Sequence, residues 1–201
     1  YEGLGMGFVS TMLVCDYISG ATGSIATAFG AHTGIGTMPI TLYGTEEQKK
    51  QYVPKLATGE WFGAYCLTEP GAGSDLANIL TSAVLSTGTY TIEGSKIWTS
   101  EANKADWMYC LVRTAKTVKK QAGISFILID LKQPNVDIKP IQLLSGQSPF
   151  CQVFVDNILA KESHRVAPEN DGWKVAKRLL EFERTMMADM ESEGAVDIEP
   201  L

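Results

Sequence analysis

Residues 65–75 read YCLTEPGAGSD, and the interpretation of the whole chain starts from this stretch. It begins as a short strand and ends in a tight Pro-Gly-Ala-Gly turn. Glycines let a ligand come close to the backbone, and free N–H groups in such a turn can hold an anionic or carbonyl-rich ligand. The alternative interpretation is a plain β-turn that Ser74 and Asp75 cap.

A second stretch, residues 94–100, reads GSKIWTS. An indole beside consecutive hydroxyl residues at a strand end can stack on a planar ring while a hydroxyl hydrogen-bonds the edge of that ring. The alternative interpretation of Trp98 is a core residue at the margin of a sheet. Each stretch alone therefore leaves a ligand site and a purely structural role open.

Short β-branched and aromatic runs, separated by turn residues, surround both stretches. Residues 89–93 alternate as a half-buried strand does, and residues 124–129 are almost continuously apolar, which indicates an interior strand. So many short strands within about a hundred residues predict an antiparallel barrel or sandwich. The predicted strands span 61–68, 81–86, 89–98, 107–113, 124–131, 136–141 and 151–156.

Helices are predicted on both sides of the strands. Residues 6–28 and 30–43 are rich in Ala, Met, Leu and Ile. Thr45 with Gln48 three residues later is a capping-box pattern, so residues 45–58 should be helical, with Pro54 kinking or shortening the helix. Gly59 is the predicted stop.

A last helix is predicted after Gly172, while the acidic residues 189–201 receive no assigned structure. The predicted organisation is α+β and multidomain. A helical part spans residues 1–60, a central β-domain spans residues 61–168, and residues 169–201 start a second helical part.

Taken together and in this order, the two stretches resemble the two flavin-contacting signatures of the FAD-dependent acyl-CoA dehydrogenase family. Further matching pieces are YGTEEQK at residues 43–49, GISF at residues 123–126 and LEFER at residues 180–184. The resemblance covers about residues 1–187. It implies a helical domain, a central β-domain and a C-terminal helical bundle, with FAD bound between the β-domain and the bundle in a fold that is not Rossmann-like.

The resemblance also implies roles for single residues. Tyr65, Leu67 and Thr68 would lie along the flavin ring, and Trp98 and Thr99 would lie near it. Gly73 and Ser74 would line the meeting point of FAD and the acyl-CoA chain, with Ser74 reaching the pantetheine part. Ser100 stands where the family usually has a Thr that hydrogen-bonds the flavin. Glu69 would hold the turn in a structural role.

The implied reaction is α,β-dehydrogenation of an acyl-CoA thioester to the trans-2-enoyl-CoA. It needs a carboxylate base, and Glu183, directly before Arg184, matches the base position of a minority of the family. In most branches the base lies beyond the end of this chain. An ordinary helix residue, paired within its turn, is the alternative interpretation of Glu183. Glu181 and Arg184 match positions that approach the thioester or nucleotide end of the substrate.

Composition excludes some partners and favours others. The net charge of −6 argues against nucleic acid as a main partner. Only two histidines leave little material for a metal site, and none is predicted. The resemblance implies electron-transfer flavoprotein as the electron acceptor and a homo-oligomer, a dimer of dimers, as the full-length form. We expect a bacterial cytoplasmic or mitochondrial matrix location, since no targeting segment is visible.

The chain is expected to be a fragment that lacks the early N-terminal helices and most of the C-terminal bundle. Three alternatives therefore stay open: an acyl-CoA oxidase on the same scaffold, a flavin monooxygenase on that scaffold, and a non-catalytic truncated fragment.

Overall fold

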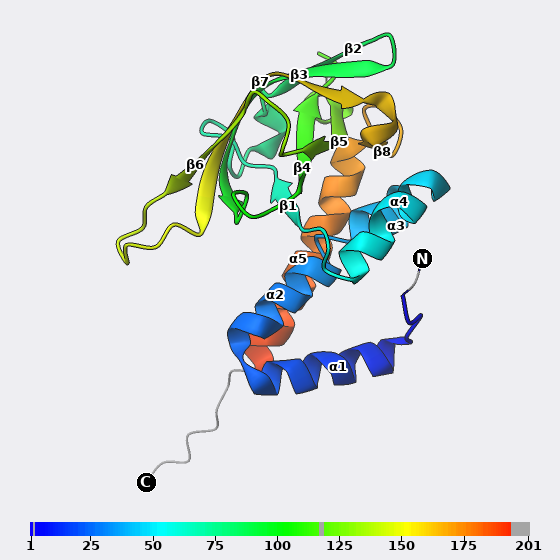
Figure 1. Ribbon diagram of the computed structural model, residues 1–201, viewed down its shortest axis with the longest axis vertical. Coiled ribbons are helices and arrows are strands. Elements are labelled where there is room, and N and C mark those ends of the chain that lie inside the picture. The colour runs from blue at the N-terminus through cyan, green and yellow to red at the C-terminus, as the bar shows by residue number, and fades with distance from the viewer. Residues whose placement is uncertain (2, 117–118, 194–201) are drawn as a thin grey trace.

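A computed structural model describes Tyr1, residues 3–116 and residues 119–193 (Figure 1). Four helices come first: α1 (Phe8–Ala21), α2 (Gly23–Thr33), α3 (Met38–Tyr43) and α4 (Glu46–Ala57). The predicted helix over 6–28 is in fact two helices. Thr22 is extended between them, and its side chain caps α2 by accepting a hydrogen bond from the Ser24 N–H.

The predicted helix over 45–58 is confirmed as α4. Thr45 and Gln48 form both hydrogen bonds of a capping box, and Gly59 follows the helix with a φ of +73°. The helix runs through Pro54 to Ala57, so Pro54 does not end it. The Gln48 amide also donates to the carbonyls of Ser163 and Arg165, which ties α4 to the end of the β-domain.

One eight-stranded sheet follows, in the order β6-β7-β3-β2-β4-β5-β8, with β1 paired to β4. Most pairs are antiparallel, as predicted, but β1 runs parallel to β4 and β2 meets β4 in parallel at one position. The strands are β1 (Gly63–Cys66), β2 (Ser82–Ser86), β3 (Thr89–Ser100), β4 (Trp107–Arg113), β5 (Ile124–Asp130), β6 (Val136–Ile141), β7 (Phe150–Lys161) and β8 (Arg165–Val166).

The sheet curls so that its two halves face each other across one core. Along β4, Met108 and Cys110 point into this core. Tyr109 and Leu111 point to a second core, which lies between the sheet and the helices α3, α4 and α5. This alternation is what a strand covered on both faces requires. The sheet is therefore buried on one side by itself and on the other by helices.

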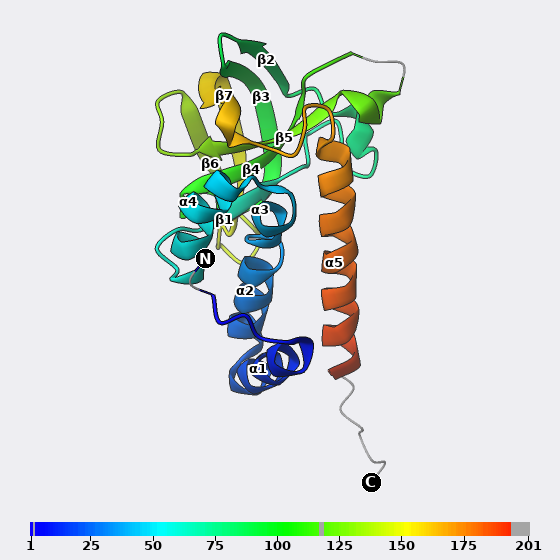
Figure 2. The same cartoon turned by 90° about the vertical axis from the view of Figure 1, so that its right-hand side faces the viewer.

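Helix α5 (Gly172–Glu193) stands on the sheet and extends away from it alongside α2 (Figure 2). It continues beyond residue 189, into the acidic segment for which the sequence predicts no structure. The remainder of that segment, residues 194–201, lies outside the described residues. Val175, Ala176 and Leu179 are buried against the second core. At the base, a Cβ on Gly172 would lie 2.4 Å from the backbone of Ser125, so only glycine allows this approach.

Candidate functional site

A cavity of about 720 Å³ opens where α2, the edge of β1 and β3, and α5 meet. Its volume is in the range of small-molecule and cofactor sites. The lining brings together six of the residues singled out from the sequence: Tyr65, Leu67, Thr68, Trp98, Ser100 and Glu183. They come from β1 and the segment directly after it, from β3 and from α5, so the fold brings distant parts of the sequence to one space.

Trp98 reaches this cavity because β3 bulges. The register between β3 and β7 shifts between Lys96 and Thr99, and Trp98 has a φ of +61°. Left-handed backbone is costly for a bulky residue and is found mainly where function requires it. The indole is 53% exposed and packs edge-on against Phe150, with ring centroids 6.0 Å apart. One face of a large aromatic ring is thus available to a ligand.

Three polar groups around the cavity lack partners. Among the residues that the structure describes, the hydroxyls of Thr68 and Ser100 make no side-chain hydrogen bond, and the buried Tyr65 Oη has no partner either. Ser100 is exposed and Thr68 is half-buried, so both hydroxyls are open to a ligand, whereas the Tyr65 Oη is enclosed by protein. The cavity therefore offers an exposed indole and two hydroxyls.

Among the side chains of α5 that the structure describes, Glu183 is the carboxylate that lines the cavity. It is half-buried and lies one turn after Leu180, which lines the same cavity. Burial raises the pKa of the Tyr65 hydroxyl well above its ordinary value, and the negative charge of Glu183 raises it further. Both residues line the same cavity.

The sequence did not reveal the opposite wall. Ala28, Ala31, His32, Ile35 and Gly36 form it. No local pattern marks these residues, because they face the cavity only through tertiary packing.

Two hydrogen bonds hold that wall. His32 Nε2 lies 2.7 Å from the Leu56 carbonyl, and the Tyr109 hydroxyl donates to the Gly36 carbonyl at 2.5 Å. The His32 ring also packs against Phe62, with centroids 5.3 Å apart. In the sequence, His32 stands out only because the chain has just two histidines.

Several predicted site residues do not line this cavity. Thr99 is 1% exposed, and its hydroxyl is 3.1 Å from Cys66 Sγ in the core. The Thr99 side chain thus points to the face opposite Trp98 and Ser100, as alternation in a strand requires. Any contact from Thr99 to a ligand would have to come from its backbone.

Gly73 and Ser74 lie exposed in the turn and are not among the cavity-lining residues. Glu181 and Arg184 are exposed on α5 and are not among them either. Glu181 accepts a hydrogen bond from Arg178 at 3.0 Å, which is the pairing within one helical turn that competes with a substrate role.

Glu69 has the structural position that the turn motif implied. Its carboxylate accepts hydrogen bonds from the N–H groups of Leu80 at 2.6 Å and Thr81 at 3.0 Å, and it pairs with Lys96 at 2.8 Å. Burial raises the pKa of Glu69, but the charge of Lys96 and these hydrogen bonds outweigh burial and hold the pKa below its usual value. Glu69 is thus a buried carboxylate that stays ionised.

Over the described part of the chain, no cluster of three or more His, Cys, Asp or Glu side chains could hold a metal ion. Within the same residues, no helix is both long enough and apolar enough to cross a bilayer.

Comparisons with known proteins agree with this architecture. Residues 1–60 match the N-terminal domain of acyl-CoA dehydrogenases, and residues 64–158 match the middle domain. The chain is 41% identical to acyl-CoA dehydrogenase FadE34 of Mycobacterium tuberculosis over 149 residues, which are 74% of this chain and 21% of that protein. It is 33% identical to an acyl-CoA dehydrogenase of Bacillus subtilis over 190 residues, which are 94% of this chain and 50% of that protein.

A solved acyl-CoA dehydrogenase from Geobacillus kaustophilus superposes with a TM-score of 0.85 at 29% identity, covering 94% of this chain and 50% of that one. The chain therefore has the acyl-CoA dehydrogenase fold. It belongs to the acyl-CoA dehydrogenase family, and it spans between 21% and 50% of the length of the two relatives named above.

Members of this family are flavoproteins, so the residues can be tested against FAD. The cavity meets the demands of a flat, polar-edged ring. Trp98 offers an exposed aromatic face, and Thr68 and Ser100 offer hydroxyls that make no hydrogen bond within the described residues. The residues present fit the ring part of FAD.

Proposed function

We propose that this chain is the flavin-facing part of an FAD-dependent acyl-CoA dehydrogenase, which converts an acyl-CoA thioester to the trans-2-enoyl-CoA. One observation carries the proposal: an exposed indole, unpartnered hydroxyls and a carboxylate face one cavity in a fold of this family. Fold alone would not carry it, since function depends on the site.

FAD, when bound, would accept the β-hydrogen of the substrate as hydride. Trp98 would cover one part of the ring, while Thr68 and Ser100 would donate hydrogen bonds to its polar edge. Ser lacks the methyl group that stiffens the Thr rotamer, so we expect weaker positioning from Ser100 than from the family's usual Thr.

Glu183 is proposed as the base that removes the proton from the carbon next to the thioester carbonyl. It lies on the cavity-facing side of α5, one turn from Leu180. The α-proton of a thioester is only feebly acidic, so the base needs a dry site and a pKa matched to its task. The wall from α2 would exclude water from that side.

Gly73 and Ser74 are proposed to meet the ligand outside the cavity, where the turn is exposed, with Ser74 toward the pantetheine. Glu181 and Arg184 would meet the thioester or nucleotide end, on the exposed side of α5. For the whole protein we further propose electron-transfer flavoprotein as electron acceptor, a dimer of dimers as the assembly, and a bacterial cytoplasmic or mitochondrial matrix location.

The test is a visible absorption spectrum of the purified chain with and without added FAD, followed by anaerobic addition of acyl-CoAs of several lengths. Retained flavin that bleaches with one of them is the expected result. Glu183→Gln should retain flavin but not bleach, whereas the exposed control Glu60→Gln, in a surface pair with Lys55, should behave as the parent.

Flavin that bleaches equally well in Glu183→Gln would exclude Glu183 as the base. Rapid reoxidation of the reduced flavin by oxygen would instead indicate an oxidase or a monooxygenase. A chain that never retains flavin would be a non-catalytic fragment by itself.

A further inference from the structure

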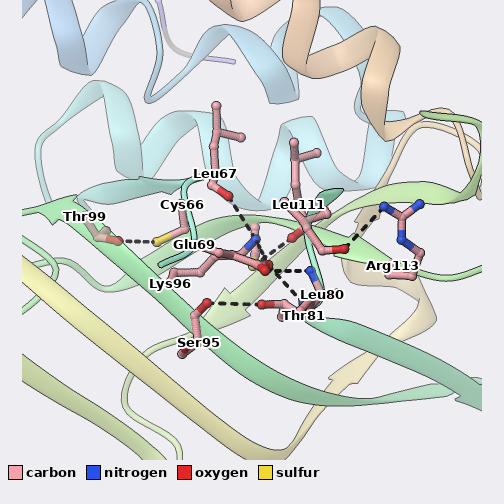
Figure 3. Close-up of polar contacts among 12 residues, drawn as sticks. Cys66, Leu67, Glu69, Leu80, Thr81, Ser95, Lys96, Thr99, Leu111 and Arg113 are labelled. Carbon is pink, nitrogen blue, oxygen red and sulfur yellow. Dashed lines mark hydrogen bonds and ion pairs between the residues drawn. The ribbon is translucent and has the colours of Figure 1, made fainter. Parts of the chain in front are cut away.

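A buried ion pair behind the cavity has no part in the reaction just described. Lys96 Nζ lies 2.8 Å from Glu69 Oε1, and the two side chains are 0% and 6% exposed (Figure 3). Removing two charges from water is expensive, and an apolar pair of similar volume is often as stable. The pair is therefore poor evidence for stability and needs another explanation.

The pair ties three separate segments to one point. Glu69 accepts hydrogen bonds from the N–H groups of Leu80 and Thr81, the two residues directly before β2. Lys96 Nζ also donates to the Leu67 carbonyl at 3.1 Å. Residues 67–69, residues 80–81 and Lys96 of β3 thus share one charged centre (Figure 3).

Two of these segments carry the ring-facing side chains. Leu67 and Thr68 directly precede Glu69, and Trp98 follows Lys96 by two residues. The Ile97 N–H donates to the Thr68 carbonyl at 2.9 Å, so a backbone hydrogen bond also joins the two segments beside the ion pair. Any shift of Lys96 against Glu69 would therefore move both cavity-lining segments, the one with Thr68 and the one with Trp98.

The bulge in β3 leaves the backbone around Trp98 without strand pairing, so other contacts must hold it. Register with β7 is lost between Lys96 and Thr99, so the ladder with β7 does not fix Trp98. The left-handed φ at Trp98 must then be held by its surroundings. Those surroundings include the Phe150 ring, the Lys96–Leu67 and Ile97–Thr68 hydrogen bonds, and the contact of Thr99 with Cys66.

We propose that Glu69 and Lys96 are positioning residues that set the spacing between Thr68 and Trp98, and so shape the cavity for the flavin ring. The inference rests on the proposed function of this cavity. A charged, hydrogen-bonded pair fixes both distance and direction, whereas apolar side chains can slide and repack. The cost of burying the charges is thus balanced by geometric definition at the site.

The test compares Lys96→Met, Glu69→Gln and the double variant of the full chain with the parent. Each single variant leaves one buried charge uncompensated, whereas the double variant leaves none. A merely structural ion pair would therefore be rescued in the double variant, and a positioning pair would not. Lys139→Met is the matched control, because it breaks the exposed Lys139–Asp137 pair on β6.

The first readout needs no ligand. Amide hydrogen exchange at Ile97, Leu80 and Thr81 is compared with exchange at amides of β4 and β5, together with the urea midpoint. In the double variant we expect the midpoint to return toward the parent while exchange at Ile97 stays faster by about tenfold, because local opening is separable from global unfolding. Parallel recovery of both quantities, or unchanged exchange at Ile97 in every variant, would overturn the proposal.

The second readout is titration with FAD, followed by flavin fluorescence and visible circular dichroism. We expect the double variant to bind about tenfold more weakly, since loss of preorganisation lowers affinity. Parent-like affinity and dichroism in the double variant would overturn the proposal. If the parent itself binds no FAD, the flavin proposal fails for this chain, and the exchange experiment alone decides whether the pair positions Trp98.

Discussion

The two walls of the cavity differ in how they are held. The β-domain wall belongs to a sheet with two cores, and many of its residues are fully buried, including Ile92, Cys110 and Phe126. The α2 wall belongs to a helix with no buried residue among those described, and α1 beside it exposes large apolar side chains such as Val9 and Tyr17. One wall is thus anchored by packing and the other by a few hydrogen bonds.

This difference predicts that the fold and the shape of the cavity respond to different changes. The sheet is buried within itself on one face and under α3, α4 and α5 on the other, while the α2 wall is held over the cavity by the His32 and Tyr109 contacts. A change in the sheet should therefore cost global stability. A change in the helical wall should alter the cavity more than the fold.

The strongest test of the comparison is Phe126→Ala in β5. Phe126 is fully buried and contacts the rings of Tyr65 and Tyr109. We expect a loss of about 3–5 kcal/mol in the free energy of unfolding, because truncation of a buried aromatic side chain leaves a cavity. Urea denaturation measures it. Phe154→Ala, at a side chain that is 40% exposed, is the control and should cost clearly less.

Acid should weaken the β-domain through Glu69. The pKa of Glu69 is lower in the folded chain than the ordinary 4.5, so the unfolded chain binds the proton more tightly. The contribution is complete above pH 4.5 and is lost as the pH falls through the folded value.

Glu69→Gln should cost about 3 kcal/mol at pH 7, because it removes one partner of a buried ion pair and leaves the Lys96 charge uncompensated. The difference between the variant and the parent should narrow below pH 4.5, in urea midpoints measured across that range. A difference that stays constant with pH would show that the charge of Glu69 is not what stabilises the turn.

A smaller effect is expected at the joint between the two walls. Tyr109→Phe removes the hydroxyl that donates to the Gly36 carbonyl and leaves the buried ring in place. We expect a loss of about 1–1.5 kcal/mol, the typical value of one hydrogen bond. We also expect faster amide exchange around residues 34–37. Uniform acceleration over the sheet instead would contradict the idea of a separately held wall.

The smallest effect is expected in α1. Leu13→Ser replaces a side chain of α1 that is 54% exposed. Among the described elements, α1 packs mainly against α2 and not against the sheet. Surface changes of this kind usually stay within about 0.5 kcal/mol. A large drop in the urea midpoint would show that α1 supports the sheet after all, and the comparison would fail.

Local chemistry made much of the fold predictable. The capping box at Thr45 and Gln48 is a short-range pattern, and it appears in the structure with both hydrogen bonds. Short β-branched and aromatic runs likewise located the strands, although β7 extends to Lys161, beyond the predicted end at residue 156, and the two-residue β8 was not predicted. Long-range pairing has no such signature, so the parallel contact of β1 with β4 was missed.

The candidate site was predictable in part for the same reason. Trp98 and Ser100 lie two residues apart in a strand and share one face, whereas Thr99 between them faces the core. Period-two alternation contained that distinction, and grouping the three hydroxyl and aromatic neighbours together overlooked it. The α2 wall could not be foreseen, because its distance to β1 is set by packing through Tyr109 and Phe62.

The tight seat of Gly172 on Ser125 makes α5 a lever with a fixed pivot. Glu183 lies eleven residues from that pivot, about 16 Å along the helix at 1.5 Å per residue. A tilt of about 5° at the base would move its carboxylate by about 1.4 Å, and misplacement by about 1 Å can cost a hundredfold in rate. Gly172, which has no reactive side chain, thereby helps to set the position of the proposed base Glu183.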